Sequence, residues 1–507
     1  MSIFRLARGS WVLVVFFFAV VFSVMTIESA KAQDFRRGDC NVDGRADISD
    51  GIFVLLYNFA GEASPTCLDS CDVNDDGTVD ISDAISLFSF LFAGGMEPPV
   101  PGLDVCGPDP TADPIGCTSF GRCSDCPTFG VSTSSLQRNV EVVVAASGNF
   151  LAVWEDDNDL DDLFQIRAGS FTPDNLDLLD PFTVNSTSAG QQLEPAVGMS
   201  ADESFVVVWQ DDSNLNGLYE VRARGFNTDG TERFPQFQVN VGSSGQQLRP
   251  DIACAANKNF VVVWDDDSDS DGLFQVHTRG FNADGTELFS EFTVNTGSAG
   301  QQFASQIAMD PLGNFVVVWH DDRDENGLFE IKARGFNADG SESIAQFTVN
   351  SSSSGQQIAP SIAMAANGDF VVAFGDDRDQ DGNFQVKARG FNADGTELIA
   401  QFTVNTSSAG QQSNPSLAMD SDGNFAVAYN HDGDNDGRFH IYMRAFNADG
   451  TERLEARKLN CIGPAQHFDP SAGLTESGSV LVFWNETLVG APVQVVGRSV
   501  VESDVAP

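Results

Sequence analysis

Basic and histidine side chains are scarce in this chain of 507 residues. Its 27 lysines and arginines face 73 aspartates and glutamates, and it has 5 histidines, so the formal net charge is −46 at pH 7. Nucleic-acid phosphates and anionic membrane surfaces repel a polypeptide this acidic, which argues against both as partners. The same charge favours solubility and bound divalent cations, because hard cations prefer carboxylate oxygens.

Sequence motifs of common catalytic sites are also missing. The chain contains no Gly-x-Ser-x-Gly nucleophile elbow, no zincin helix and no P-loop. Its histidines are scattered rather than placed at metal-ligand spacing: His277, His320, His431, His440 and His467. A glycoside hydrolase needs only two carboxylates, so that class of enzyme stays open.

Long apolar runs are confined to the N-terminus. Arg5 and Arg8 precede an apolar run over residues 11–25, and the small side chains of Ala30 and Ala32 then offer a cleavage site. These features predict a secretory signal peptide that is cleaved near Ala32. The run is shorter than the roughly 20 residues that a membrane-spanning helix needs. We therefore expect a secreted protein, extracellular or periplasmic, with no membrane span.

A unit of about 55 residues recurs through most of the chain, a period in the range of repeat architectures. Its aromatic anchor falls at Trp154, Trp209, Trp264, Trp319, Phe374, Tyr429 and Trp484. Each unit holds four runs of β-branched and aromatic residues, separated by turn-forming clusters such as residues 282–285, Asn-Ala-Asp-Gly. Seven units of four strands predict a mainly β fold, a seven-bladed β-propeller, with an all-β solenoid as the alternative.

The two ends of the repeat region complement each other. The last unit stops after its third strand, residues 493–500, whereas Phe129 to Ser132 precede the first unit and match the fourth strand Phe402 to Asn405. If the early segment completes the last blade, the ring closes and no sheet edge is left exposed. An open solenoid does not bring its two ends together, so an extra strand at one end could not complete the unit at the other. The chain ends therefore favour the propeller.

Two oxygen-rich loops lie between residues 34 and 97, each followed by an apolar segment, Ile52 to Phe59 and Ala84 to Phe92. Both have the spacing of an EF-hand calcium loop, with glycine at position 6 and a backbone carbonyl expected at position 7. The predicted ligands are Asp39, Asn41, Asp43, Arg45, Asp47 and Asp50 in the first loop, and Asp72, Asn74, Asp76, Thr78, Asp80 and Asp83 in the second.

This duplicated loop and helix, with Asp-Ile-Ser-Asp closing each loop, resembles a type I dockerin domain. The resemblance implies a small helical module that binds Ca²⁺ and docks onto a cohesin-like or other protein. It departs from many dockerins in the partner-reading positions, which carry Leu56-Tyr57 and Ser89-Phe90 instead of basic residues. We expect Phe53, Phe88 and Phe92 to pack in the core of this small domain, because exposed apolar patches are uncommon.

A cysteine-rich linker follows at residues 98–127. An exported chain meets an oxidising compartment, so disulfides are expected, with the pairing open, among Cys40, Cys67, Cys71, Cys106, Cys117, Cys123 and Cys126. The Cys123 and Cys126 spacing also suits a zinc knuckle or a redox pair, but no histidine and no second Cys-x-x-Cys accompany it. Cys254 stands where other repeats carry methionine, which predicts a buried apolar role, and Cys461 has no evident mate.

Six repeats carry an acidic loop of the form Asp-x-Asp-x-Asp-Gly, sometimes with asparagine, on the face shared with a Gly-Gln-Gln loop. The loops resemble the calcium hairpins of integrin-type (FG-GAP) propellers, although they lack Asp at position 9. A bound cation would relieve the repulsion of packed carboxylates, while a solvated turn is the alternative. The candidate ligands are Asp157, Asp159, Asp161, Asp212, Asn214, Asn216, Asp267, Asp269, Asp271, Asp322, Asp324, Asn326, Asp377, Asp379, Asp381, Asp432, Asp434 and Asp436.

Two further side chains recur blade by blade. Glutamine pairs such as Gln301-Gln302 can either bind sugar hydroxyls as a ring of amides or tie each loop to the backbone of a neighbouring blade, and we expect the second role. Arginines such as Arg279, in the third strand, suit packing between blades.

We therefore expect a signal peptide at 1–32, a dockerin-like calcium-binding domain at 34–97, the linker at 98–127 and the propeller at 128–507. The function that these features favour is a secreted, calcium-binding, non-catalytic scaffold, whose propeller recognises a glycan or a protein on its acidic face. A carbohydrate-active hydrolase or an accessory subunit in polysaccharide breakdown is the alternative, and paired carboxylates in an asymmetric pocket would support it.

Overall fold

The computed structural model describes residues 35–42, 46, 48–61, 64–93, 95–96, 98–102, 106–107, 109, 111, 115–117, 129–130, 136–173, 177–433, 435–460, 465–487 and 492–500. The expected signal peptide lies outside these residues, as do Asp43, Arg45, Asp47, Cys123, Cys126, Asp434 and Cys461. The chain divides into two compact units, Met1–Cys123 and Ser124–Pro507. No helix within the described ranges is both long and apolar enough to cross a membrane.

The first unit is built from two helices of equal length, α1 (Ile48–Ala60) and α2 (Ile81–Ala93), which pack against each other, and a short pairing of β1 (Phe35–Arg36) with β2 (Cys106–Gly107). Each helix begins several residues before the apolar segment that predicts it, because the end of each calcium-type loop forms the first helical turn. A Cβ on Gly51 would clash with the ring of Phe88, so glycine permits the close helix contact.

Disulfides hold the first unit together, as predicted for an oxidising compartment. Among the described residues, Cys40 pairs with Cys71 and Cys67 pairs with Cys117. Phe53 and Phe88 pack against the small core around Val54, which confirms their expected role. The core prediction is wrong for Phe92, whose side chain is 68% exposed at the end of α2.

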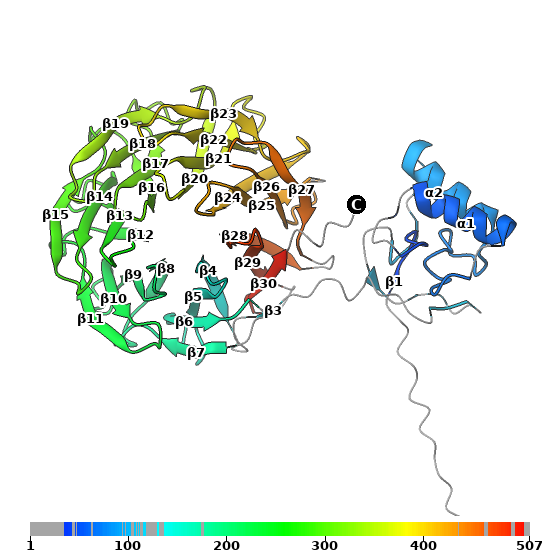
Figure 1. The fold of residues 1–507 in the computed structure, drawn as a ribbon, viewed down its shortest axis with the longest axis horizontal. Helices are drawn as coiled ribbons and strands as arrows, with labels where there is room; N and C mark the ends of the chain where they lie inside the picture. The colour runs from blue at the N-terminus through cyan, green and yellow to red at the C-terminus, as the bar shows by residue number, and fades with distance from the viewer. Residues whose placement is uncertain are drawn as a thin grey trace, which may run out of the picture. The chain divides into compact units, whose positions relative to one another are not determined.

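The second unit is a ring of seven four-stranded antiparallel sheets, the predicted seven-bladed propeller (Figure 1). The first six blades run from the ring axis outward in chain order, because short turns join neighbouring antiparallel strands. The first three blades are β4 (Gln137–Val144), β5 (Phe150–Asp156), β6 (Gln165–Phe171) and β7 (Asp177–Thr183); β8 (Gln192–Met199), β9 (Phe205–Asp211), β10 (Glu220–Phe226) and β11 (Glu232–Gln238); and β12 (Gln247–Cys254), β13 (Phe260–Asp266), β14 (Gln275–Phe281) and β15 (Glu287–Thr293).

The remaining four blades repeat this arrangement. They are β16 (Gln302–Met309), β17 (Phe315–Asp321), β18 (Glu330–Phe336) and β19 (Glu342–Thr348); β20 (Gln356–Met364), β21 (Phe370–Asp377), β22 (Gln385–Phe391) and β23 (Glu397–Thr403); β24 (Gln411–Met419), β25 (Phe425–Asp432), β26 (His440–Phe446) and β27 (Glu452–Lys458); and β28 (Gln466–Leu474), β29 (Val480–Thr487) and β30 (Gln494–Val500), completed by β3 (Phe129–Gly130).

The seventh blade is completed by the early segment of the chain, as predicted. Phe129 pairs with Gly497 and Gly130 pairs with Val496, both antiparallel, so β3 is the fourth strand beside β30. Val131 and Ser132, the rest of the predicted segment, lie outside the described residues. The seventh blade also packs on the first, where β28 and β29 contact β4 (Figure 1). The ring is therefore closed, and the solenoid alternative is excluded.

The core of the ring lies between the blades. The second strand of each of the first five blades is buried at every position, and the aromatic anchors Trp154, Trp209, Trp264 and Trp319 have no exposed surface. Large aromatic side chains bury about 150–250 Å² each, so this layer supplies much of the hydrophobic stabilisation. Cys254, a half-buried free thiol, packs against the same layer, as its place in the repeat predicts.

Two recurrent polar side chains tie neighbouring blades together, and both predicted roles are confirmed. Arg279 donates a hydrogen bond of 2.7 Å to the carbonyl of Val239 in the preceding blade, and five other blades make the same kind of contact. Gln301 donates from Nε2 to the carbonyl of Gly272 at 2.8 Å and accepts from the amide of Phe274 at 3.2 Å. The glutamine amides therefore link each loop to the backbone of the neighbouring blade.

Candidate functional site

The innermost strands of the ring are not regular. Each has a β-bulge near its start, where the register to the second strand shifts. The bulged residue has a left-handed backbone, with φ between 48° and 54° in Asn139, Glu194, Arg249, Ala304, Ala359, Asn414 and Asp469. That conformation costs roughly 1–2 kcal/mol for a residue other than glycine, so the surroundings must hold it. Bulges re-aim side chains, and here they occur at the axis.

The residue that follows the aromatic anchor holds the next blade's bulge in place. Glu155 accepts a hydrogen bond from the backbone amide of Glu194 at 2.8 Å. Gln210 and Asp265 accept in the same way from the bulges of the following blades, at 3.1 and 2.9 Å. In the fourth blade, His320 Nε2 accepts from Ala359 at 2.5 Å. Burial lowers the pKa of His320 to about 3, so its ring is a neutral structural acceptor.

A pocket of about 260 Å³ opens among five of the innermost strands, and therefore lies at the axis. Its polar lining differs from blade to blade. The side chains and backbone that form it belong to Glu141, Glu194, Pro195, Arg249, Pro250, Asp251, Ala304, Ser305, Gln306, Ala359 and Pro360. Here five of the seven similar modules present unlike polar groups at one point, which is what a selective binding or catalytic site requires.

Burial changes the proton affinity of the carboxyl groups in this pocket. Desolvation, followed by the negative charge of Glu155, raises the pKa of Glu194 to about 7 although its side chain is exposed to the channel. Desolvation raises the pKa of Asp251 to about 6. Burial also raises the pKa of Glu141, first by desolvation and then through the charge of Asp251. Near neutral pH the pocket therefore offers both protonated carboxyl donors and carboxylate acceptors.

Among the residues that line the pocket, Arg249 is the cation that balances part of this charge. Arg249 donates from Nε to Asp265 at 2.6 Å, and Asp265 is fully buried. The guanidinium also lies over the rings of Phe303 and Phe274, 5.2 and 5.6 Å from their centroids. These contacts orient Arg249 before any ligand arrives, which lowers the entropy lost on binding.

The sequence prediction missed this pocket. The even spacing and similar loops give no sign of converging unlike residues, because the asymmetry lies inside the first strand of each repeat. Glu141, Asp251 and their equivalents Ala196, Gln306, Ser361, Ser416 and Ser471 occupy one position of the repeat. That variable position, in otherwise similar strands, is the signal that points to the axis.

The predicted acidic loops lie on the face where this pocket begins. Gln137, the first residue of β4, pairs with Asp156, the last residue before the first acidic loop. The acidic loop and the start of the innermost strand therefore share that face. In three loops the carboxylate oxygens of all three aspartates lie within 4.8 Å of one another: Asp157, Asp159 and Asp161; Asp267, Asp269 and Asp271; and Asp377, Asp379 and Asp381. These groupings match the predicted ligand sets.

The backbone also folds toward the first aspartate of each loop. The amide of Gly272 donates to Asp267 at 3.1 Å, and the amide of Leu273 donates to Asp271 at 2.7 Å. Loops with fewer carboxylates have the same shape, since Gly217 donates to Asp212 at 3.1 Å and Gly327 donates to Asp322 at 3.1 Å. Asn214, Asn216, Asp324 and Asn326 complete these two loops, and Asp432 and Asp436 flank the sixth.

The second calcium-type loop of the first unit shows the same local geometry. Gly77 donates to Asp72 at 2.8 Å, and Thr78 donates from its amide to Asp76 at 3.1 Å. The two loops also match each other, because the amide of Asn74 donates to Asp83 at 3.2 Å as that of Asn41 does to Asp50 at 3.0 Å. Neither loop is among the groups of three carboxylates within 4.8 Å that the described residues form.

Burial raises the pKa of two carboxyl groups in the second of these loops. Desolvation, aided by the charges of Asp72 and Asp76, raises the pKa of Asp83 to about 7. Desolvation also raises the pKa of Asp72. A cation at the centre of the loop would stabilise both carboxylates in their charged form.

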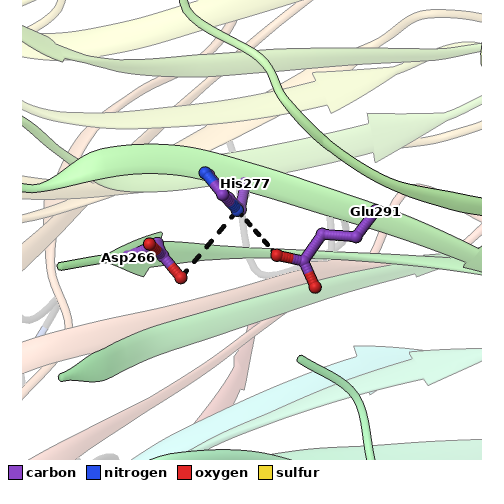
Figure 2. A group of neighbouring side chains, drawn as sticks. All are labelled: Asp266, His277 and Glu291. Atoms are coloured by element: carbon purple, nitrogen blue, oxygen red, sulfur yellow. Dashed lines mark hydrogen bonds and ion pairs between the residues drawn. The ribbon is translucent and has the colours of Figure 1, made fainter. Parts of the chain in front are cut away.

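One histidine lies beside two carboxylates, although the sequence shows the histidines scattered. His277 Nδ1 is 2.9 Å from Glu291 Oε1 and 3.8 Å from Asp266 Oδ2 (Figure 2). The three residues come from three neighbouring strands of one blade, so a turn of the chain separates each from the next. Strand register, which the sequence alone does not reveal, brings them together.

Comparisons with known proteins do not place the chain in a family. No family model matches it, and no curated protein matches it. Similar solved structures include a protein of unknown function from Dyadobacter fermentans, with 11% identity, 73% of this chain and 98% of that chain covered, and a TM-score of 0.44. A Hadza microbial sialidase has 10% identity, coverage of 79% and 72%, and a TM-score of 0.44.

An α-L-arabinofuranosidase of Fusarium graminearum gives comparable values, with 12% identity, coverage of 62% of this chain and 94% of that chain, and a TM-score of 0.43. At these identities and TM-scores the likenesses assign no activity to this chain.

Proposed function

We propose that this chain is a secreted, calcium-binding recognition protein. Its propeller binds a polyhydroxylated ligand, such as the end of a glycan, in the axial pocket, and its first unit attaches it to another protein. The observation that carries the proposal is the axial pocket, where Glu141, Glu194, Arg249 and Asp251 interrupt the repetition of the ring. The two disulfides of the first unit support an oxidising, extracellular location.

The chemistry of the pocket suits hydroxyl groups. A hydroxyl both donates and accepts, and the pocket presents carboxyl groups in both protonation states, a guanidinium and an amide side chain. Its volume of about 260 Å³ is at the small end of ligand pockets, which typically span about 300–1,000 Å³, so it admits one sugar unit and not an extended chain.

The first unit presents an apolar surface to a partner. Apolar side chains recur at helical spacing along the exposed face of each helix, and three of the four positions in α1 have an apolar counterpart in α2, where Ser89 takes the place of Leu56. The exposed residues are Ile48, Ile52, Leu56 and Phe59 on α1 and Ile81, Ile85 and Phe92 on α2. We name these two stripes the α1 stripe and the α2 stripe. Exposed apolar patches of this kind mark protein contacts, so a cohesin-like or other protein is the proposed partner.

Calcium is the proposed cofactor of both units. Hard oxygen ligands, a glycine at position 6 and amides turned toward the first aspartate support this choice in the loops of Asp72 and Asp267. The bound cation would hold each loop in one conformation.

A glycan array probed with the calcium-loaded full chain tests the ligand proposal. We expect binding by the wild-type chain and at least a tenfold loss of affinity in Arg249→Met and Glu194→Gln. Asn414→Ala is the matched control, because Asn414 occupies the equivalent bulge of a blade that does not line the pocket. The absence of any glycan ligand, or equal binding by all variants, would overturn the proposal.

Hydrolysis of a glycoside at the same pocket is a second candidate function, favoured by one observation. Glu141 and Asp251 share the pocket, and burial together with the charge of Asp251 raises the pKa of Glu141, which is how one carboxyl is kept as a general acid beside a carboxylate. Release of reducing sugar by the wild-type chain, abolished in Glu141→Gln and Asp251→Asn while binding persists, would establish an enzyme. Binding without release supports recognition alone.

A further inference from the structure

The third blade differs from its neighbours on the face that carries His277. His277 lies opposite Trp264 on β13 and opposite Thr293 on β15. Side chains two residues apart in a strand share a face, so Asp266, two residues after Trp264, and Glu291, two residues before Thr293, lie on the same side as His277. One ligand atom from each of the three residues lies within 4.8 Å of the others (Figure 2).

The neighbouring blades carry a different set of charges at these positions. The second blade has Asp211, Arg222 and Gln236 there, and the fourth has Asp321, Lys332 and Gln346. Arg222 lies 3.6 Å from Asp211, so these three residues together are neutral, and Arg222 also pairs with Glu220 at 2.9 Å, a position that Gln275 occupies in the third blade. The first blade also pairs Arg167 with Asp156, at 3.7 Å.

In the third blade, both substitutions shift the charge in the negative direction. Histidine replaces the arginine or lysine, and Glu291 replaces the glutamine. With a neutral imidazole the set carries two negative charges where the equivalent three residues of its neighbours carry none. Among the ion pairs of the described residues, Asp266 and Glu291 have His277 as their partner and no lysine or arginine. A divalent cation would restore the balance that the neighbouring sets have.

The other atoms of the three side chains are already bonded. Glu291 Oε2 accepts from the amide of Val241 in the second blade at 2.7 Å, and Asp266 Oδ1 accepts from the amide of Ser268 at 2.9 Å. His277 Nε2 lies 3.0 Å from Thr293 Oγ1. These contacts leave His277 Nδ1, Glu291 Oε1 and Asp266 Oδ2 turned toward one point, where Nδ1 and Oε1 share a hydrogen bond whose proton a metal would replace. Outer hydrogen bonds that orient a histidine and its carboxylate neighbours are typical of metal sites.

We propose that Asp266, His277 and Glu291 form a site for a divalent transition metal of the zinc class. Imidazole with two carboxylates is a nitrogen and oxygen donor set that suits Zn²⁺ or Co²⁺ and differs from the all-oxygen loops proposed for calcium. Ligands about 2.0–2.2 Å from a tetrahedral metal lie roughly 3.3–3.6 Å apart. The observed 2.9 and 3.8 Å from Nδ1 to the two oxygens bracket that range. Both His277 and Glu291 are partly exposed, so water can supply a fourth ligand.

Co²⁺ spectroscopy on the full chain tests the site, with calcium in excess so that the acidic loops are occupied. We expect one equivalent of Co²⁺ to give the visible absorption of a four-coordinate site, and one equivalent of Zn²⁺ to remove it. The double variant His277→Arg with Glu291→Gln recreates the residues that the second blade has at these positions, so it should fold normally and lose the absorption. His277→Gln should lose it as well, and guards against a folding defect in the double variant.

A matched control excludes adventitious histidine binding. His440 and His467 both contact Asn460, and glutamine stands at both positions in other repeats. His440→Gln with His467→Gln should leave the Co²⁺ spectrum and its stoichiometry unchanged. The proposal is overturned if calcium-saturated wild-type protein takes up no Co²⁺, in which case the cluster is an ion pair, or if the His277 variants retain the signal.

Discussion

The carboxylate of Asp265 and the backbone amide of Ala304 form a hydrogen bond of 2.9 Å across the interface between the third and fourth blades. Asp265 also accepts from Arg249 at 2.6 Å, so one fully buried carboxylate holds both the bulge of the next blade and the guanidinium of the axial pocket. The stability of the ring and the shape of the pocket therefore depend on the same side chain.

Replacing Asp265 should accordingly damage both. Asp265→Ala leaves the amide of Ala304 without its acceptor and Arg249, whose side chain is 40% exposed, without its partner, so we expect a loss of about 1–3 kcal/mol. Asp265→Asn keeps an acceptor for the amide but not the charge, so we expect a smaller loss, about half as large. Urea denaturation monitored by tryptophan fluorescence measures both values. Equal losses in the two variants would show that the hydrogen bond to the bulge contributes nothing.

The stability of the propeller should fall between mildly acidic and neutral pH because of Glu194. Its folded-state pKa of about 7 lies above its ordinary value of 4.5, so the native chain retains a proton that the unfolded chain releases. By linkage, the contribution of this group to stability is fully present below pH 4.5 and is lost as the pH rises through 7.

Melting temperatures at fixed ionic strength and calcium concentration measure this effect. Glu194→Gln should gain stability relative to the wild-type chain as the pH is raised from 4.5 through 7, and the difference should level off above that range. Gln306→Ala alters the same pocket without changing a titrating group, so its curve should run parallel to that of the wild-type chain. A Glu194→Gln curve that also runs parallel would contradict the assigned pKa.

The fold could be predicted from the sequence because its determinants are local and repeated. Aromatic anchors at a constant spacing, four strand-like runs per unit and complementary ends were sufficient for the ring and its closure. The acidic loops could be predicted for the same reason, since the aspartates of each set, such as Asp267, Asp269 and Asp271, alternate along one short stretch of chain.

The axial pocket and the His277 cluster depend on relationships that the sequence does not display. Glu141 and Asp251 lie two repeats apart and approach only when the first and third blades turn their inner strands toward one axis. His277 and Glu291 meet through the register of β14 with β15, and that register includes a bulge. Phe92 was predicted to be buried because its apolar character was interpreted as a sign of the core, whereas it ends an exposed stripe.

Calcium should bind most tightly to the loops with three aspartates. Asp267, Asp269 and Asp271 supply three carboxylates, whereas the second-blade loop supplies only Asp212, beside Asn214 and Asn216. Calcium affinity rises with the number of charged ligands. In calorimetry of the full chain, Asp269→Asn with Asp271→Asn should remove one site, and Asn214→Asp with Asn216→Asp should add one. An unchanged number of sites in both variants would mean that these loops are solvated turns.

The exposed stripes on α1 and α2 should affect partner binding and not folding. Phe59 and Phe92 are 70% and 68% exposed, so replacing either with serine should change stability by less than about 0.5 kcal/mol. Because the two stripes are equivalent, each single variant should retain most of the binding to a cohesin panel in biolayer interferometry, and the double variant should lose it. A destabilised single variant would instead place these side chains in the core.

The paired glutamines should differ in their effect on stability, although they are neighbours in sequence. Gln302 is fully buried, donates to the carbonyl of Ala299 at 2.7 Å and accepts from Asn295 at 3.2 Å. Gln302→Ala removes both of these hydrogen bonds at a fully buried position, although Asn295 keeps its bonds to Gln275 and Gly297, so we expect a cost of about 1–3 kcal/mol in total. Gln301 makes two hydrogen bonds nearer the surface, where water can replace the lost amide, so Gln301→Ala should cost about 1 kcal/mol or less. Urea denaturation of the two variants makes the comparison within one loop. If Gln301→Ala proved the more damaging, the tie between blades, and not the buried amide network, would be what holds this face of the ring together.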